Sequence, residues 1–314
     1  MAKSSFWLDS EDDVKLHVQK WIKPRSNDPK AIVQISHGMV EHIGRYDDFA
    51  HFLVSQNIFV YGNDHRGHGQ TGTAHGMMGL LSEKDGFEKA TNDLYIVTKH
   101  IQEEHPETPI FLLGHSFGSF LARHYIQLHS EDIEGVIISG TGGHPGMANI
   151  AAKRIAQQQL KKDLLGVPSP MLNKLVFRAY NKRVTNPKSP FDWLSHDEKQ
   201  VLQYAEDPLC GFIPSASFFY DMFHGLDLVH NDKLIKKIRK GLPMLFVTGE
   251  EDPVGKYGSD IWKVMKQYQK HDIDDITANF YPHGRHEMLN EINKVDVYKD
   301  ILKWIEFYLP EEDE

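Results

Sequence analysis

One short segment combines a nucleophilic side chain with the backbone context that would activate it. Residues Gly114–Gly118 have the sequence Gly-His-Ser-Phe-Gly, follow the apolar run Ile110–Leu113 and lead into an amphipathic stretch that starts at Phe117. This order of strand, tight turn and helix is the context of a nucleophile elbow. The two terminal glycines let the helix pass close to the strand, and the helix N-terminus offers free N–H groups to a developing anion. We therefore expect Ser116 to be a nucleophile.

A serine hydroxyl needs a base, and the base needs an acid to orient it. The predicted strand Met244–Thr248 leads into a loop that holds Glu250, Glu251 and Asp252. In a protein with this type of elbow the acid follows the serine in the chain, after a later strand. We choose Asp252 among the three, because the proline and glycine that follow it would fix a turn aiming it inward.

The base is expected one strand further along. The predicted strand Ala278–Tyr281 leads into a loop that holds His283 and His286. Either imidazole could take the serine proton. We choose His286, because Gly284 lets the chain turn before it.

The oxyanion formed during attack on a carbonyl needs two N–H donors. The first is expected at the backbone of Phe117, directly after the nucleophile, and the second in a loop after an early strand. That loop is Ser36–His42. Its Gly38 lets the backbone approach a substrate, and the Met39 N–H is the expected second donor.

The residues that carry this chemistry need a sheet that brings them to one edge. Short apolar runs alternate with longer amphipathic segments, which is typical of α/β proteins. Several runs are apolar on both faces, which indicates a mostly parallel, doubly wound sheet with ligands at the carboxyl ends of its strands. The predicted strands are Lys15–Trp21, Ala31–Ser36, Phe59–Asn63, Ile110–Gly114, Gly135–Ser139, Met244–Thr248 and Ala278–Tyr281, and the predicted helices are Tyr46–Gln56, Glu88–Glu104, Phe117–His129, Tyr257–Gln269 and Val295–Leu309.

One stretch, residues 141–215, breaks this alternation and shows no strand pattern. We interpret it as a helical cap inserted into a core made of residues 1–140 and 216–314. Its helical segments are separated by Gly and Pro and are expected at Asn149–Leu165, Pro170–Asn181 and Ser195–Ala205.

The cap has a charge opposite to that of the whole chain. Between Ile150 and Arg183, eight cations and one acid give +7 within a chain of −9. This pattern is typical of a solvated basic face, and it also favours transient contact with an anionic membrane, where each nearby cation contributes ~1 kcal/mol. The cations are Lys153, Arg154, Lys161, Lys162, Lys174, Arg178, Lys182 and Arg183, the acid is Asp163, and the interleaved apolar residues are Ile155, Leu160, Leu164, Leu165, Leu172, Leu175, Val176 and Phe177.

Composition excludes several other protein classes. The net charge of −9 over 314 residues argues against a nucleic-acid-binding protein, which normally has a basic excess. Cys210 is the single cysteine, so neither an intramolecular disulfide nor a cysteine-based zinc site can form. No apolar run approaches the ~18 residues of a membrane span, and residues 1–13 lack the apolar core of a secretory signal. We expect a cytoplasmic protein that needs no cofactor and touches the membrane only peripherally.

Five motifs in order along the chain resemble a known family. They are His37-Gly-Met-Val-Glu-His42 with Arg45-Tyr46, Asn63-Asp-His-Arg-Gly-His-Gly69, Gly114–Gly118, Glu251-Asp-Pro-Val-Gly255, and Tyr281-Pro-His-Gly-Arg-His286 with the region up to Glu291. Together they resemble the monoacylglycerol lipase/lysophospholipase group of α/β-hydrolases in its bacterial form, and the resemblance extends over residues from about 5 to 309.

The resemblance implies an α/β-hydrolase fold with a helical cap. It also implies that Ser116, Asp252 and His286 form the triad, with Met39 and Phe117 as the oxyanion donors. The chain departs from the family pattern at Phe117, where relatives often have Met. This difference changes the wall of the acyl site and leaves the backbone donor in place.

The segment Asp64–Gly69 contains two histidines, His65 and His68, that are spaced like metal ligands. The sequence places no third ligand beside them, and serine hydrolysis requires no metal. We therefore expect no metal site. The resemblance implies instead that this loop braces the sheet edge near the oxyanion loop.

These residues predict a serine hydrolase that cleaves carboxylic esters through an acyl-enzyme. The resemblance implies lipid esters with a single acyl chain, either monoacylglycerol or lysophospholipid. The same triad could serve a short-chain carboxylesterase or a peptidase-like amidase, whereas a non-catalytic binder would not need a complete triad. Serine at the elbow excludes an aspartate-nucleophile dehalogenase or epoxide hydrolase. The sequence does not indicate an oligomeric state.

Overall fold

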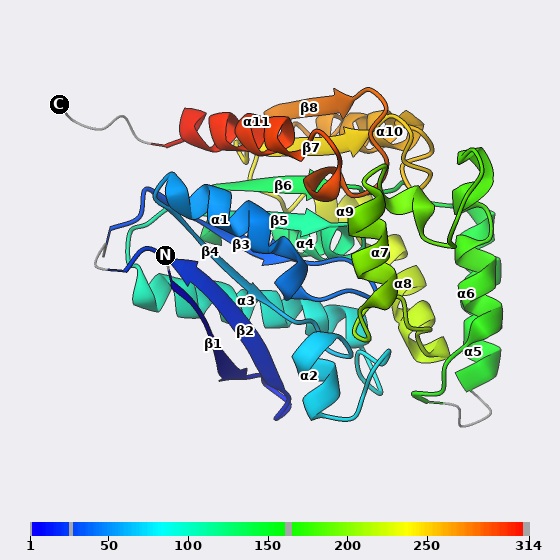
Figure 1. Cartoon of the computed structure of the whole chain (residues 1–314). Coiled ribbons are helices and arrows are strands. Elements are labelled where there is room, and N and C mark those ends of the chain that lie inside the picture. Colours follow the sequence, from blue (N-terminus) through cyan, green and yellow to red (C-terminus); the bar gives the residue numbers. More distant parts are fainter. Residues whose placement is uncertain (1, 25–27, 161–164, 310–314) are drawn as a thin grey trace.

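The computed structural model describes residues 2–24, 28–160 and 165–309, and an eight-stranded sheet runs through its centre (Figure 1). The strand order is β1-β2-β4-β3-β5-β6-β7-β8. The first two neighbouring pairs in this order are antiparallel, and the other five pairs are parallel. The strands are β1 (Ala2–Asp9), β2 (Lys15–Ile22), β3 (Ala31–Ser36), β4 (Ile58–Asn63), β5 (Ile110–His115), β6 (Gly135–Ser139), β7 (Met244–Gly249) and β8 (Ile276–Tyr281).

The predicted mostly parallel sheet is confirmed. Each of the seven predicted strands is present, with ends that lie within two residues of the prediction. The sequence prediction missed β1. This strand is an exposed edge strand in which only Phe6 and Leu8 pack against the core, so it lacks the apolar run that marks a buried strand.

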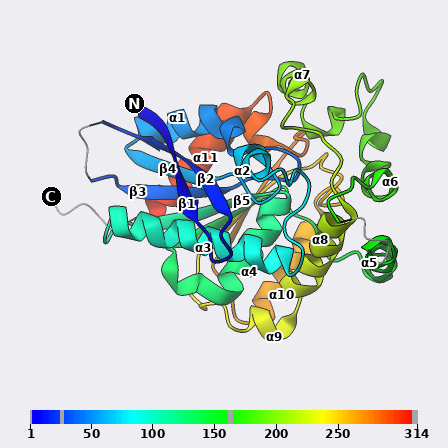
Figure 2. The ribbon, with the colours of Figure 1, turned by 90° about the horizontal axis from the view of Figure 1, so that it is seen from below.

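Helices cover the sheet on two faces, as Figure 2 shows. Alternate residues of one strand enter different cores because successive side chains point to opposite faces. On β3, Ile32 joins the core under α3, α4, α8 and α10, whereas Val33 and Ile35 join the core under α1 and α11. The helices are α1 (Asp47–Ser55), α2 (Gly69–Ala74), α3 (Gly86–Glu104), α4 (Phe117–His129), α8 (Ala216–Val229), α9 (Asp232–Ile235), α10 (Ser259–Gln269) and α11 (Lys294–Phe307).

The segment at residues 141–215 lies beyond the carboxyl ends of the parallel strands (Figure 1). It contains α5 (Met147–Leu160), α6 (Pro170–Phe177) and α7 (Glu198–Glu206), with short 3₁₀ turns at Tyr180–Arg183 and Asp192–Leu194.

All three predicted helices in this segment have different ends. The first starts at Met147, two residues before the prediction, and Leu165 lies in a turn, whereas its predicted residues 161–164 lie outside the described residues. The second helix is shorter than predicted and ends at Phe177. The third starts at Glu198 because the Asp197 carboxylate accepts hydrogen bonds from the backbone N–H groups of Lys199 and Gln200, which makes Asp197 the N-cap.

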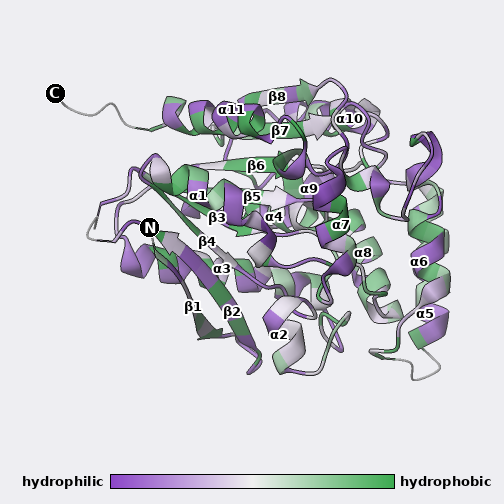
Figure 3. Ribbon diagram, in the orientation of Figure 1, coloured by the Kyte–Doolittle hydropathy of each residue, from purple (hydrophilic) through white to green (hydrophobic). Residues whose placement is uncertain are grey.

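Helix α8 was not predicted, because it has no continuous polar face. Ten of its fourteen residues are buried, so the apolar residues do not follow a clear period of 3.6. It packs against α5 on one side and against α3 and α4 on the other. Figure 3 shows the central strands as mainly hydrophobic, in contrast to the mixed surface of α5 and α6.

The predicted basic face of the cap is only partly present in the structure. Lys153 points toward α8, where its Nζ lies 2.9 Å from the Asp227 carboxylate, and the Arg183 guanidinium stacks 3.6 Å above the Tyr257 ring. Arg154, Lys174, Arg178, Lys182 and Arg183 are exposed, whereas Lys161, Lys162, Asp163 and Leu164 lie outside the described residues.

None of the helices in the described part of the chain has the length and apolar character that crossing a membrane requires.

Candidate active site

The turn between β5 and α4 places Ser116 in a strained conformation. Its φ of 52° and ψ of −118° are unusual for a residue with a side chain. The turn is possible because both flanking positions are glycine. A Cβ atom at Gly118 would collide with the Ser36 carbonyl, and one at Gly114 would collide with the Gly118 carbonyl. The backbone N–H of Ser116 donates to the Ser139 carbonyl at 2.9 Å, which ties the elbow to β6.

The two residues predicted as acid and base form a buried pair. The Nδ1 atom of His286 lies 3.0 Å from Oδ2 of Asp252, and both side chains are almost fully buried. The other Asp252 oxygen accepts a hydrogen bond of 2.8 Å from the backbone N–H of Val254, which fixes the carboxylate. Because Nδ1 of His286 faces Asp252, Nε2 is the ring nitrogen that can accept a proton from a nucleophile.

The alternative histidine and acid face solvent. The side chain of His283 is 91% exposed, and its Nδ1 lies 3.5 Å from a carboxylate oxygen of Glu251. Glu250 is exposed as well. None of these three residues lines the cavity that contains Ser116.

Aromatic rings hold the His286 imidazole from two sides. Its ring centroid lies 4.8 Å from that of His115 and 4.8 Å from that of Trp193. Burial acts to lower the pKa of His286, but the charge and hydrogen bond of Asp252 outweigh it and raise the pKa above the ordinary value of 6.5. Burial, together with His286, lowers the pKa of His115 to about 4, so His115 is neutral at physiological pH.

The predicted oxyanion donors lie in the same cavity as Ser116 and His286. Phe117 is the first residue of α4, and an N–H in the first turn of an α-helix has no acceptor within the helix. The loop that carries Met39 is fixed at its start, because the backbone N–H of His65 donates to Nε2 of His37 at 2.9 Å. Segment Asp64–Gly69 therefore braces the loop that carries Met39.

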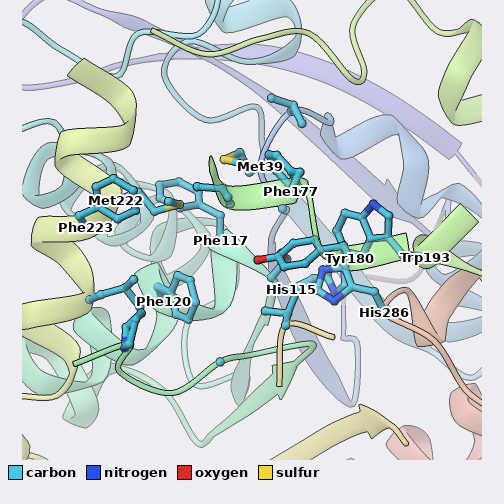
Figure 4. Close-up of a pocket in the computed structure, with 18 of the residues that line it drawn as sticks. Met39, His115, Phe117, Phe120, Phe177, Tyr180, Trp193, Met222, Phe223 and His286 are labelled. Atoms are coloured by element: carbon cyan, nitrogen blue, oxygen red, sulfur yellow. The ribbon is translucent and has the colours of Figure 1, made fainter. Parts of the chain in front are cut away.

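The cavity has a volume of about 400 Å³ and two chemically different ends. Figure 4 shows Tyr180, Trp193, His115 and His286 gathered at one end, with the Tyr180 oxygen pointing into the cavity. The opposite end is apolar. It is lined by Phe120, Ala148, Ala152, Met222, Phe223 and Leu226, from α4, α5 and α8.

One group of side chains in the described part of the chain has metal-ligating atoms close together. The ligating atoms of His42, Asp207 and Cys210 lie within 4.8 Å of one another. The group offers only three donors. Burial raises the pKa of the Cys210 thiol and keeps it protonated, and the Arg45 charge nearby would repel a cation. These residues therefore do not fit a metal ion well.

Sequence reasoning missed the residues that come from the cap. Trp193 and Tyr180 lie 93 and 106 positions before His286, and no local pattern marks either of them. Glu287 was also missed, although it directly follows the predicted base. Its position beside His286 was the available signal.

Fold and site together define an α/β-hydrolase with a serine elbow. Residues 27–293 match the family Hydrolase_4, which is described as serine aminopeptidase, S33. The monoglyceride lipase of Rattus norvegicus is 38% identical over 302 residues, which cover 95% of this chain and 89% of the relative. The monoacylglycerol lipase of Mycolicibacterium smegmatis is 25% identical, with 90% of each chain covered.

The fold is also found in solved structures. A thermostable carboxyl esterase from Bacillus coagulans, in complex with glycerol, superposes with a TM-score of 0.90 at 25% identity, over 98% of this chain and 99% of the esterase. The chain belongs to the Hydrolase_4 family and, within the α/β-hydrolases, to the monoglyceride lipase-like serine hydrolases. The resemblance found in the sequence motifs is thereby confirmed.

Proposed function

We propose that this protein hydrolyses carboxylic esters of lipids with a single acyl chain, with monoacylglycerols as the first substrate class to test. The observation that carries the proposal is the cavity itself. One end holds Ser116 and His286 beside polar groups, and the other end is an apolar region lined by α4, α5 and α8. Such an arrangement suits one acyl chain with a small polar head. The kinship with monoglyceride lipases supports this choice of substrate.

The proposed reaction uses three side chains. Ser116 Oγ attacks the ester carbonyl while Nε2 of His286 takes its proton, and Asp252 orients the imidazole and stabilises its cation. The backbone N–H groups of Met39 and Phe117 donate to the oxyanion. His286 then gives the proton to the leaving alcohol, and the acyl group stays on Ser116. A water molecule, deprotonated by His286, attacks the acyl-enzyme and releases the fatty acid.

The cap is proposed to cover this site and to contact lipid surfaces. In this proposal residues 141–215 form the cap, and residues 1–140 and 216–314 form the core. The exposed surface of α5 and α6 carries large apolar side chains, with Met147 86%, Ile150 51% and Met171 56% exposed. Leu175, also on α6, is both exposed and part of the cavity wall.

A lipid membrane is the partner that fits this surface. Arg154 and Lys174 are exposed on the same two helices, so apolar and cationic side chains are interleaved there. Apolar side chains would enter the acyl region of the bilayer, and the cations would attract anionic headgroups. Contact at this place would bring the cavity mouth to the lipid that holds the substrate. The protein would then be cytoplasmic and peripheral at the membrane.

A substrate panel tests the proposed function. Purified protein is assayed with p-nitrophenyl esters from acetate to palmitate, monoacylglycerols, lysophospholipids and a peptide amide. A preference for monoacylglycerols, measured as kcat/KM, is the expected result. A preference for acetate esters would instead favour a short-chain carboxylesterase, in line with the similarity to the Bacillus coagulans esterase. Cleavage of the amide alone would favour a peptidase-like enzyme, and no turnover on any substrate would contradict the proposal.

A further inference from the structure

A buried chain of charged groups connects the oxyanion loop with the loop of the proposed base. We propose that Glu41, Arg45 and Glu287 act as positioning residues that hold the oxyanion donor and His286 in register with each other. The inference rests on the proposed function, because it assigns a role to groups that surround the proposed triad. None of the three residues is expected to take part in bond making or breaking.

The Arg45 guanidinium forms a forked ion pair with Glu287. Its two terminal nitrogens lie 2.6 and 2.7 Å from the two Glu287 carboxylate oxygens. Both side chains are less than one-tenth exposed. A two-point pair of this kind fixes direction as well as distance. Since Glu287 is bonded directly to His286 along the chain, the pair restrains the backbone that carries the proposed base.

The same guanidinium also reaches the oxyanion loop. Nη1 of Arg45 lies 2.5 Å from Oε2 of Glu41. The other oxygen of Glu41 accepts hydrogen bonds from the backbone N–H of Gly38 and from the hydroxyl of Tyr46, the latter at 2.9 Å. Gly38 immediately precedes Met39, whose N–H is the proposed donor. Glu41 therefore holds the peptide unit directly before the one that contains the Met39 N–H.

The cap closes the chain of contacts on a third side. The Arg45 guanidinium stacks 4.8 Å from the ring centre of Tyr204 on α7, and the Tyr204 hydroxyl donates to the Val40 carbonyl at 3.0 Å. The backbone N–H of Glu287 donates to the carbonyl of Leu194 at 2.8 Å. The oxyanion loop, the loop of His286 and the cap therefore all contact the buried guanidinium of Arg45.

The charges of the group also act on the base. Burial acts to raise the pKa of Glu41 and of Glu287, but the neighbouring Arg45 outweighs it and holds both values below the ordinary one. Two carboxylates and one guanidinium leave one net negative charge near His286. The charges of Glu287 and Glu41 add to the effect of Asp252 in raising the pKa of His286.

The first test is the variant Glu287→Gln, which keeps the shape of the side chain. The fork to Arg45 is weakened and the negative charge is lost. We expect kcat to fall by at least about 10-fold, because small misplacements of reacting groups are costly, while KM changes little. We also expect the pKa of His286 to fall, so the acid limb of the kcat/KM profile moves to lower pH. Titration of the His286 ring by NMR measures this shift without any turnover.

The second test asks whether the residues act as one unit. Glu41→Gln, Glu287→Gln and the double variant form a cycle around Arg45. If both carboxylates act through the shared guanidinium, the double variant loses little more kcat than the worse single variant. Arg45→Lys, which cannot fork, should show a similar loss of kcat.

Tyr46→Phe is the matched control, because it removes one hydrogen bond to Glu41 and leaves Gly38, Glu41, Arg45 and Glu287 connected. We expect it to lower the melting temperature slightly and to keep kcat within about twofold of wild type. The proposal is overturned if Glu287→Gln and Arg45→Lys lower only the melting temperature, with kcat and the His286 titration unchanged. Losses that add fully in the double variant would also overturn it. If wild type turns over no ester, the proposed function fails, whereas the titration still decides this inference.

Discussion

His286 and Asp252 form a buried pair, with 3.0 Å between Nδ1 and the carboxylate oxygen, a few residues from a solvent-exposed pair of histidine and glutamate. In the exposed pair, His283 lies 3.5 Å from Glu251. The two pairs come from the same two loops, one after β7 and one after β8. Both are acid–histidine pairs, but burial shields the His286–Asp252 interaction from water and salt.

Replacement of the acid should distinguish the two pairs. Asp252→Asn should lower kcat by roughly 10⁴-fold, because an amide no longer stabilises the imidazolium or selects the correct tautomer. Glu251→Gln and Glu250→Gln should leave kcat within about twofold of wild type, since exposed ion pairs contribute little. Steady-state kinetics with a soluble ester measures all three. Similar, small losses in the three variants would mean that the acid lies elsewhere.

Replacement of the nucleophile should abolish turnover without unfolding the protein. Ser116→Ala removes one hydroxyl from the elbow, and we expect at least about a 10⁴-fold loss of kcat. A fluorophosphonate probe should label wild type at Ser116 and should not label the variant. Ser119→Ala is a suitable control, because Ser119 lies one helical turn away and its hydroxyl donates to the Ser116 carbonyl. Retention of a tenth of the wild-type turnover in Ser116→Ala would refute the assignment.

The pH dependence of kcat/KM should follow the ionisation of His286. The imidazole must be neutral at Nε2 to accept the serine proton, so activity is low below its pKa and reaches a plateau above it. Because Asp252 raises this pKa, the midpoint of the acid limb should lie above 6.5. In residual activity measurements, Asp252→Asn should move the midpoint to lower pH. A profile that stays flat down to pH 5 would contradict a histidine base.

Removal of apolar side chains from the cap should weaken membrane binding. The triple variant Met147→Ser, Ile150→Asn and Met171→Ser should lower binding to anionic vesicles by at least about 10²-fold, since each buried side chain of this kind contributes ~1.5–3 kcal/mol. Hydrolysis of a soluble short-chain ester should stay nearly unchanged. Vesicle sedimentation measures the binding.

The charge contribution to membrane binding can be measured separately. Arg154→Gln with Lys174→Gln should reduce the preference for anionic over neutral vesicles, and added salt should weaken wild-type binding, as screening predicts. The matched control replaces Phe307, which is 78% exposed at the last residue of α11, on the opposite side of the sheet from α5 and α6 (Figure 1). Equal losses from the control and the triple variant would show that the cap has no special role.

Protein stability should depend on pH through Asp221 on α8. Burial, with the Glu88 charge nearby, raises the pKa of Asp221 to about 7 from an ordinary value of 3.8. The folded state therefore binds more protons than the unfolded state between these values, so this residue makes stability fall as pH rises from about 4 to 7.

Asp221→Asn should remove that pH dependence. At pH 8 the variant should be more stable than wild type, by a few kcal/mol at most, because one pKa unit corresponds to ~1.4 kcal/mol. The amide oxygen can still accept from the backbone N–H of Gly86. Urea unfolding at pH 5 and at pH 8 measures the difference. A variant that is less stable than wild type at both pH values would contradict the prediction.

The sequence by itself determined the parts of this protein that depend on local pattern. The elbow at Gly114–Gly118 was recognisable because a tight strand-to-helix turn needs glycine at fixed positions. The buried strands were recognisable because they are apolar on both faces. The order of serine, acid and histidine along the chain also followed, since each candidate comes directly after a strand of a parallel sheet.

Only the tertiary structure decided which of the candidates meet. Asp252 and Glu251 are adjacent in sequence, and His283 and His286 lie in one loop. The fold buries the His286–Asp252 pair and leaves the His283–Glu251 pair in solvent. The missed elements have the same kind of cause. Helix α8 is buried on nearly all sides and β1 is exposed, so neither shows the periodicity of a half-buried element. Arg45 and Glu287 are 242 positions apart, and no local pattern shows that they form an ion pair, because contacts between distant segments are set by the packing of the whole fold.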